Sequence, residues 1–169
     1  MQALVEQARH YAVALVASDK PDAAGLAWAR ARGLPTFALS PKGIGKVAYE
    51  AQLDDALRAA GVEVIALAGY MRLLSDDFVA RWRERIVNIH PSLLPKYKGL
   101  DTHARAIAAG DAEHGCSVHL VTEELDAGAV LAQARVPVLA DDTPESLAAR
   151  VLVEEHRLYP ATLTEFVTR

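Results

Sequence analysis

The sequence predicts an α/β fold, in which a mostly parallel sheet carries helices on both faces. Short apolar runs with β-branched residues alternate along the chain with longer segments whose apolar residues recur at helical spacing. Residues of the turn and cap types separate these segments, and no internal repeat or linker interrupts the alternation. The 169 residues, 51% of them hydrophobic, suit one domain with a sizeable core.

In the first half of the chain, the clearest strand signal is the continuous apolar run 12–17, typical of a strand buried on both faces. Asp22 can cap a helix over 23–31, and Gly33 and Pro35 then end that helix. The remaining elements expected in this half are a helix over 4–8, a strand over 36–39, a helix over 47–60 and a strand over 62–67.

In the second half, Ser75 is expected to cap a helix that runs through Trp82, and Thr143 to cap a final helix that reaches Val167. A strand that starts at Ile86 contains Asn88 and His90. The remaining elements expected are a helix over 102–109 and strands over 117–121 and 130–136.

Asn88 and His90 form the first candidate for chemistry. Side chains on a strand alternate, so these two project from one face, and Pro91 ends the strand beside them. An amide can bind a developing oxyanion while an imidazole moves a proton, which suits chemistry on a carbonyl group. The alternative is a capped strand end with a histidine that only satisfies its hydrogen bonds.

Parallel sheets bind ligands at the carboxyl ends of their strands, so the segment 70–74 and the Asn88/His90 pair are expected to line one cleft. Asp126, in the acidic loop 122–128, is the third candidate, because a carboxylate near His90 would stabilise its imidazolium. The alternative for Asp126 is an ordinary turn aspartate. His119 is expected to contact the catalytic side chains without contacting the substrate. The alternative is a half-buried histidine without a role in the site.

Composition excludes several classes of protein. A net charge of −4 argues against a nucleic-acid partner, and the single Cys116 excludes an internal disulfide and a cysteine-based zinc cluster. The histidines lack metal-ligand spacing, so we expect no metal. No apolar run has the length of a membrane span and no signal peptide is evident, so we expect a cytoplasmic protein without membrane association.

Three separated motifs together resemble one family. The segment 88–95 (NIHPSLLP), the segment 115–119 (GCSVH) and the segment 125–128 (LDAG) resemble the folate-dependent formyltransferases, and among them the phosphoribosylglycinamide formyltransferases. The resemblance implies a Rossmann-like formyltransferase fold. It also implies formyl transfer from the co-substrate 10-formyltetrahydrofolate to the amine of glycinamide ribonucleotide in purine biosynthesis, by a monomer or homodimer.

The resemblance also assigns roles to residues. Asn88, His90 and Asp126 match the catalytic set of the family. Glu155 matches the acid that contacts the glycinamide substrate, whereas Leu152 stands where the family usually has a polar residue near that substrate. The residues implied to bind the folate are Lys46, Met71, Arg72, Leu73, Leu74, Asn88, Thr122, Glu123, Glu124, Leu125 and Asp126.

Members of the family begin with a strand and a Gly-rich phosphate loop that precede a segment like residues 1–4. The resemblance therefore implies that residues 1–169 form a single formyltransferase domain without its first strand, and that Met1 is an internal position of a longer chain. Two alternatives stay open on this basis. One is a formyltetrahydrofolate hydrolase, and the other is a folate-binding remnant without activity.

Overall fold

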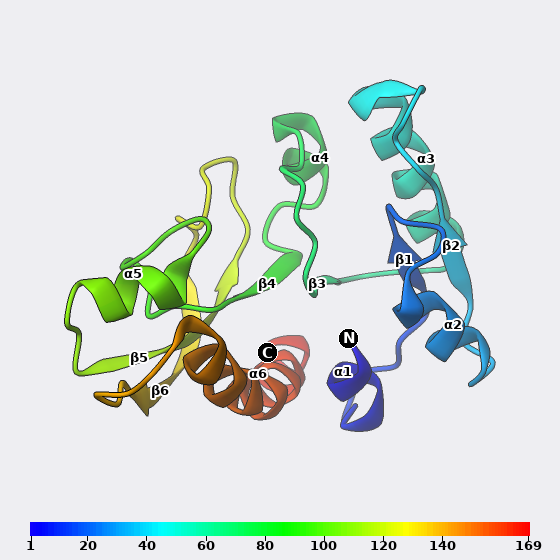
Figure 1. Ribbon diagram of the computed structural model, residues 1–169. Coiled ribbons are helices and arrows are strands. Elements are labelled where there is room, and N and C mark those ends of the chain that lie inside the picture. The colour runs from blue at the N-terminus through cyan, green and yellow to red at the C-terminus, as the bar shows by residue number, and fades with distance from the viewer.

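The computed structural model describes residues 1–169 and has the predicted α/β composition. Figure 1 shows the elements in chain order. They are α1 (Gln2–Glu6), β1 (Val16–Ser18), α2 (Ala24–Arg30), β2 (Thr36–Ala38), α3 (Gly45–Ala59), β3 (Ile65–Leu67), α4 (Asp76–Arg81), β4 (Ile86–His90), α5 (Thr102–Ala108), β5 (Glu113–Leu120), β6 (Val130–Pro137) and α6 (Pro144–Val167).

The strands form two sheets. β1 and β2 pair in parallel in one of them, and the other has the order β3-β4-β5-β6. β3 and β4 are parallel, which confirms the predicted parallel pairing, whereas β4–β5 and β5–β6 are antiparallel. The last pairing is antiparallel because the loop between β5 and β6 is too short for the crossover that parallel strands need.

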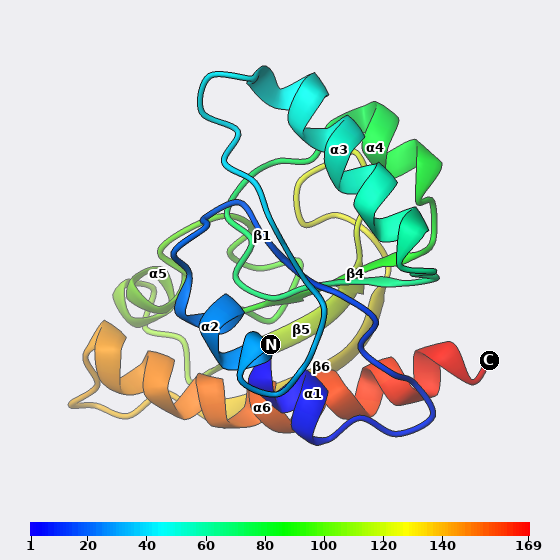
Figure 2. The same cartoon turned by 90° about the vertical axis from the view of Figure 1, so that its right-hand side faces the viewer.

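Alternation along β4 divides the core into two layers. Ile86 packs with Phe78 and Trp82 of the α4 region, whereas its neighbour Val87 packs with Tyr159 of α6. Figure 2 shows α3 and α4 on one side of the strands and α1 and α6 on the other, as predicted. Asn88 and His90 share the face of Ile86, so they point away from α6. No helix combines the length and the apolar composition that a membrane span requires.

Two of the three predicted helix caps are confirmed. The Ser75 hydroxyl accepts a hydrogen bond from the Phe78 N–H, and Thr143 forms a reciprocal capping box with Ser146. The prediction for Asp22 is wrong, because α2 begins at Ala24 with Ala23 at its N-cap and no side-chain cap. A backbone turn, in which the Ala23 N–H donates to the Lys20 carbonyl, forms the start of that helix instead.

Two predicted strands are shorter than expected. The run 12–17 pairs only from Val16 onward, and the run 62–67 only from Ile65 onward. The run 12–17 is not buried on both faces as predicted, since Ala12 and Ala17 are exposed. The backbone groups of residues 12–15 make no hydrogen bond within the chain. These runs are short because no strand lies on the side of β1 away from β2, or on the side of β3 away from β4.

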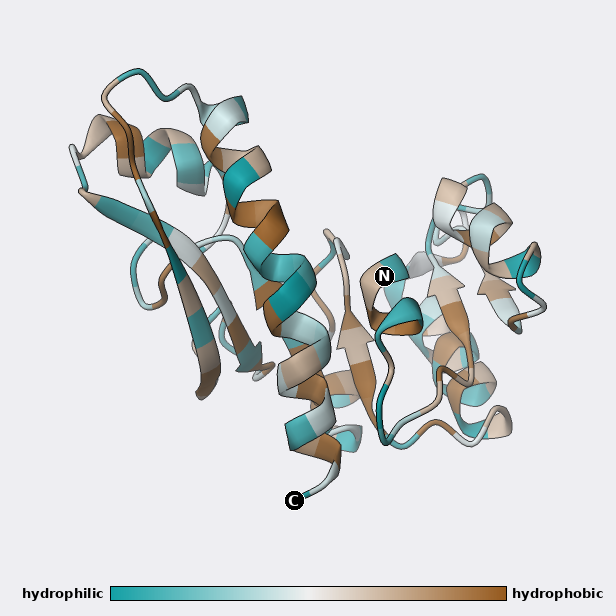
Figure 3. Cartoon of the chain, turned by 90° about the horizontal axis from the view of Figure 1, so that it is seen from below, coloured by the Kyte–Doolittle hydropathy of each residue, from teal (hydrophilic) through white to brown (hydrophobic).

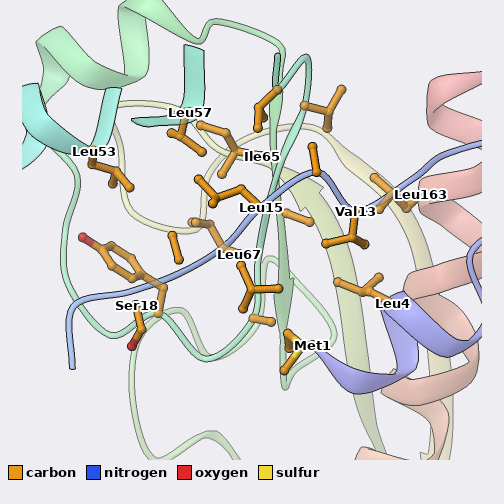
Figure 4. A pocket seen from close by; sticks show the side chains of 18 of the residues that line it. Met1, Leu4, Val13, Leu15, Ser18, Leu53, Leu57, Ile65, Leu67 and Leu163 are labelled. Atoms are coloured by element: carbon orange, nitrogen blue, oxygen red, sulfur yellow. The ribbon is translucent and has the colours of Figure 1, made fainter. Parts of the chain in front are cut away.

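Between β1 and β3 lies an apolar slot with a volume of about 840 Å³. Figure 4 shows Val13 and Leu15 from one strand segment and Ile65 and Leu67 from the other around this slot. Helix residues close it on both faces of the sheet: Leu4 and Leu163 come from α1 and α6, and Leu53 and Leu57 from α3. In Figure 3 much of the central strands is brown, the colour of apolar residues.

Candidate active site

The pairing of β4 with β5 sets the positions of the predicted polar side chains. Asn88 lies opposite His119, and His90 lies opposite Ser117. Side chains of directly opposed residues share one face of an antiparallel pair and contact each other. The two strands therefore place an amide, two imidazoles and a hydroxyl together on the face that points away from α6.

Asp126 reaches this group from the loop between β5 and β6. Its Oδ2 lies 3.4 Å from Nδ1 of His90, and its Oδ1 lies 3.6 Å from Nε2 of His119. The backbone N–H of Gly99 also donates to Oδ2, at 2.9 Å. Gly128 permits this loop path, since a Cβ there would lie 1.9 Å from the Leu120 carbonyl oxygen. The carboxylate thus bridges two buried histidines from a loop that is otherwise exposed.

The contacts of His90 fix the position of its ring. Its side chain is buried, and Nε2 lies 2.9 Å from the carbonyl oxygen of Tyr97. A carbonyl can only accept, so Nε2 carries a proton and donates it. The other ring nitrogen, Nδ1, is consequently the atom that faces Asp126.

His119 has the opposite arrangement. Its Nδ1 donates to the Leu120 carbonyl at 2.8 Å, and its Nε2 lies 3.3 Å from the amide nitrogen of Asn88. Burial lowers the pKa of His119, an effect that outweighs the hydrogen bond to Leu120 and the charge of Asp126. A neutral His119 accepts from the Asn88 amide, so its ring fixes the orientation of that amide.

Three further residues, whose role the sequence alone does not predict, hold the loop that follows β4. The Ser92 hydroxyl donates to the Lys96 carbonyl at 2.6 Å. The Ser117 hydroxyl donates to the Ser92 carbonyl at 2.6 Å and accepts from the Leu94 N–H at 3.0 Å. Gln133 on β6 donates to both the Ser117 hydroxyl and the Leu94 carbonyl. The available signal for Ser117 was its alternation with His119 on one strand.

The structure places the predicted folate-binding residues in two exposed segments. Met71, Arg72 and Leu73 are exposed and Leu74 is half-buried, and Met71 and Leu74 also line the end of the slot. Thr122, Glu123, Glu124 and Leu125 are exposed too. Glu123 forms an ion pair with Arg83, and Glu124 forms one with Lys98. Both segments are therefore open to a ligand from solvent.

The other predicted binding residues lie apart from the catalytic group. Lys46 is exposed in the first turn of α3, and Leu152 is exposed on α6. Burial raises the pKa of Glu155, and the positive N-terminal amino group partly opposes this effect. Neither Leu152 nor Glu155 makes a hydrogen bond or ion pair with Asn88, His90 or Asp126.

This arrangement can activate a carbonyl group. The Asn88 amide and the His90 imidazole can stabilise negative charge on an oxygen, and Asp126 can stabilise the imidazolium or accept a proton. No group of three or more His, Cys, Asp or Glu side chains is positioned to hold a metal ion. The site thus has the donors and the acid–base groups that acyl transfer requires.

The α/β sheet and this polar group at a strand end are together consistent with an enzyme that transfers an acyl group. The family described as "Formyl transferase" matches residues 1–163, and the chain belongs to this family. The resemblance inferred from the three motifs is therefore confirmed.

Two relatives and one solved structure show which members of the family are similar to this chain. The chain is 46% identical over 155 residues to "Phosphoribosylglycinamide formyltransferase" of Escherichia coli K12, covering 91% of this chain and 73% of the relative. It is 45% identical to the "Trifunctional purine biosynthetic protein adenosine-3" of Drosophila melanogaster, covering 99% of this chain but only 13% of that protein. The crystal structure of phosphoribosylglycinamide formyltransferase from Brucella melitensis is similar with a TM-score of 0.93 and 51% identity, covering 98% of this chain and 88% of that one.

Proposed function

We propose that the chain transfers a formyl group from 10-formyltetrahydrofolate to the primary amine of glycinamide ribonucleotide. The observation that carries the proposal is the convergence of Asn88, His90 and Asp126, which lie far apart in the sequence, around one point at the end of β4. The names of the similar proteins support the same reaction. Their shared title also supports the choice of acceptor.

In the proposed reaction, the substrate amine attacks the formyl carbon and gives a tetrahedral intermediate. The Asn88 amide and the protonated His90 stabilise the oxyanion of this intermediate, and Asp126 holds the imidazolium in place. The amine nitrogen then loses a proton, and the folate nitrogen gains one as the C–N bond to the folate breaks. A water molecule next to Asp126 relays this proton.

The co-substrate is proposed to lie against the segments 71–74 and 122–126 and to bind largely through their backbone groups. The exposure of both segments supports this position of the co-substrate. Lys46 is proposed to attract the anionic end of the folate, and Glu155 to contact the glycinamide substrate. Leu152 contributes only apolar contact there.

We further propose that residues 1–169 form one domain whose sheet is completed by an additional strand in the slot between β1 and β3. The unpaired backbone of residues 12–15 supports this proposal, because a row of free N–H and C=O groups at a strand edge can pair with a neighbouring strand. The apolar walls on both faces suit a strand whose side chains are apolar on both sides.

The experiment that tests the reaction measures formyl transfer with and without glycinamide ribonucleotide. Turnover that requires the amine is the expected result. Release of formate without the amine would identify a formyltetrahydrofolate hydrolase instead. Folate binding with neither activity would identify a remnant that only binds folate, and would overturn the proposed reaction.

A further inference from the structure

The carbonyl group that accepts from His90 belongs to a residue with an unusual backbone. Tyr97 has a φ of +56°, in the left-handed region that residues other than glycine rarely adopt. In this conformation its carbonyl oxygen lies 2.9 Å from Nε2 of His90. Such a backbone persists only where its surroundings hold it, so the contacts of Tyr97 decide whether the carbonyl stays on His90.

One set of contacts holds this carbonyl from inside the protein. The fully buried hydroxyl of Ser92 lies 2.6 Å from the Lys96 carbonyl and 3.3 Å from the Tyr97 carbonyl. Both distances refer to backbone oxygens, so this anchor does not engage the side chains of residues 96 and 97. Those side chains extend toward a carboxylate on the outside.

That carboxylate is Asp111, which lies just before β5. Its Oδ2 accepts from the Tyr97 hydroxyl at 2.7 Å, and its two oxygens lie 2.9 and 3.0 Å from Nζ of Lys96. The side chain of Asp111 is only 16% exposed, and the guanidinium of Arg105 lies 5.1 Å from the centre of the Tyr97 ring. One carboxylate thus binds two consecutive side chains by charge-assisted hydrogen bonds and fixes the peptide between them.

We propose that Asp111 is a positioning residue that acts through Tyr97 to fix the position of the His90 ring. The Tyr97 carbonyl accepts from Nε2, so Nδ1 is the nitrogen that lies beside Asp126. Without the anchor, the left-handed backbone relaxes and the carbonyl leaves Nε2. The His90 ring then loses its fixed position, and in a fraction of the enzyme Nδ1 no longer lies beside Asp126. The catalytic part of this inference rests on the proposed formyl transfer, whereas the position of the ring does not.

The experiment compares Asp111→Asn and Tyr97→Phe with the unchanged chain. Nitrogen-15 spectra of the histidine rings report which nitrogen of His90 carries the proton, and steady-state kinetics report kcat and KM. The expected result is a hydrogen-bonded Nε2–H signal of His90 from all molecules of the unchanged chain, and loss of that signal from a fraction of the molecules in both variants. We expect kcat to fall by roughly one to two decades, with a KM for the folate within about twofold.

A matched control is Glu113→Gln. Glu113 lies two residues after Asp111, and its exposed carboxylate forms an ion pair with Arg135. This variant should keep both the spectrum and kcat. Variants Asp111→Asn and Tyr97→Phe that keep the full Nε2–H signal would overturn the proposal, even if kcat fell together with the melting temperature. If one variant did not fold, the other would decide. If the unchanged chain transferred no formyl group, the spectra would still test the position of the ring, and only the proposed reaction would fail.

Discussion

Replacing Ala17 by proline tests whether the slot between β1 and β3 accepts a further strand. β1 bonds to β2 through alternate residues, since the Val16 N–H donates to Pro35 and the Ser18 carbonyl accepts from Leu39. The N–H of the intervening Ala17 therefore points into the slot. Proline at this position removes a donor that only a strand in the slot would use.

The ligand for this test is a synthetic peptide of about six valine and isoleucine residues with terminal lysines for solubility. Losing one backbone hydrogen bond while a peptide carbonyl stays unpaired costs about 1–3 kcal/mol, so Ala17→Pro should weaken binding roughly 5- to 150-fold. The matched control is Ala38→Pro. Its N–H points away from β1 at the outer edge of β2, so the variant should bind the peptide normally.

Isothermal titration calorimetry gives the dissociation constant, and hydrogen exchange shows whether the amides of residues 12–17 and 63–66 become protected. A peptide with N-methylated amides keeps its side chains but cannot donate, and it should not bind. Equal binding of both peptides would refute the reasoning, as would an equal loss in both proline variants. A dimer whose formation depends on these same amides would show that a second copy of the chain fills the slot.

Three further predictions concern catalysis and stability. Asn88→Ala should lower kcat by about two to three decades through loss of an oxyanion donor, while urea unfolding shows a loss of only about 1 kcal/mol from the bond to His119. Burial and the nearby His103 lower the pKa of His114 to about 4. The unfolded chain binds a proton there below about pH 6.5, so stability should fall by up to about 3 kcal/mol between pH 6.5 and 4, and His114→Gln should flatten this slope in urea unfolding. Gly115→Ala should lower the melting temperature, because its Cβ would lie 1.9 Å from the Ala134 carbonyl; an unchanged melting temperature would contradict this packing.

Elements with local signals could be predicted from the sequence. Ser75 and Thr143 cap their helices as expected, because a cap needs only a side-chain oxygen within reach of the next turn. Asp22 carries the same type of oxygen but fails, since the turn from Lys20 to Ala23 starts α2 one residue later. A residue of the cap type thus indicates that a helix begins nearby. It is a weaker indication that its own side chain caps that helix.

Elements that depend on distant partners could not be predicted. The run 12–17 has the composition of a buried strand, yet only Val16–Ser18 pairs, because β2 spans only Thr36–Ala38 and no strand lies on the other side of β1. The apolar composition of a segment shows that it can form a buried strand. Whether it does so depends on where the neighbouring strand lies, and the residues of the segment itself do not show that position.

The candidate site divides in the same way. The alternation of Asn88 and His90 predicts their shared face, and the strand β4 confirms the geometry on which that prediction depends. The sequence offers Asp126 as a carboxylate that lies near His90 or only forms a turn, and the family resemblance favours the first of these. The Tyr97 carbonyl had no signal, because a backbone oxygen is the same in every residue and only the fold determines where it points.

The orientation of the Asn88 amide shows how much of the proposed chemistry depends on such backbone groups. The Leu120 carbonyl takes the Nδ1 proton of His119, so Nε2 of that ring can only accept while the ring is neutral. An amide turned the other way would place its oxygen against this acceptor at 3.3 Å, and two acceptors repel. Asn88 must therefore direct its NH₂ group toward His119, which leaves its second N–H for an oxyanion. The Leu120 and Tyr97 carbonyls thus set the hydrogen-bonding direction of His119 and His90, and through them the donors that the reacting oxygen meets.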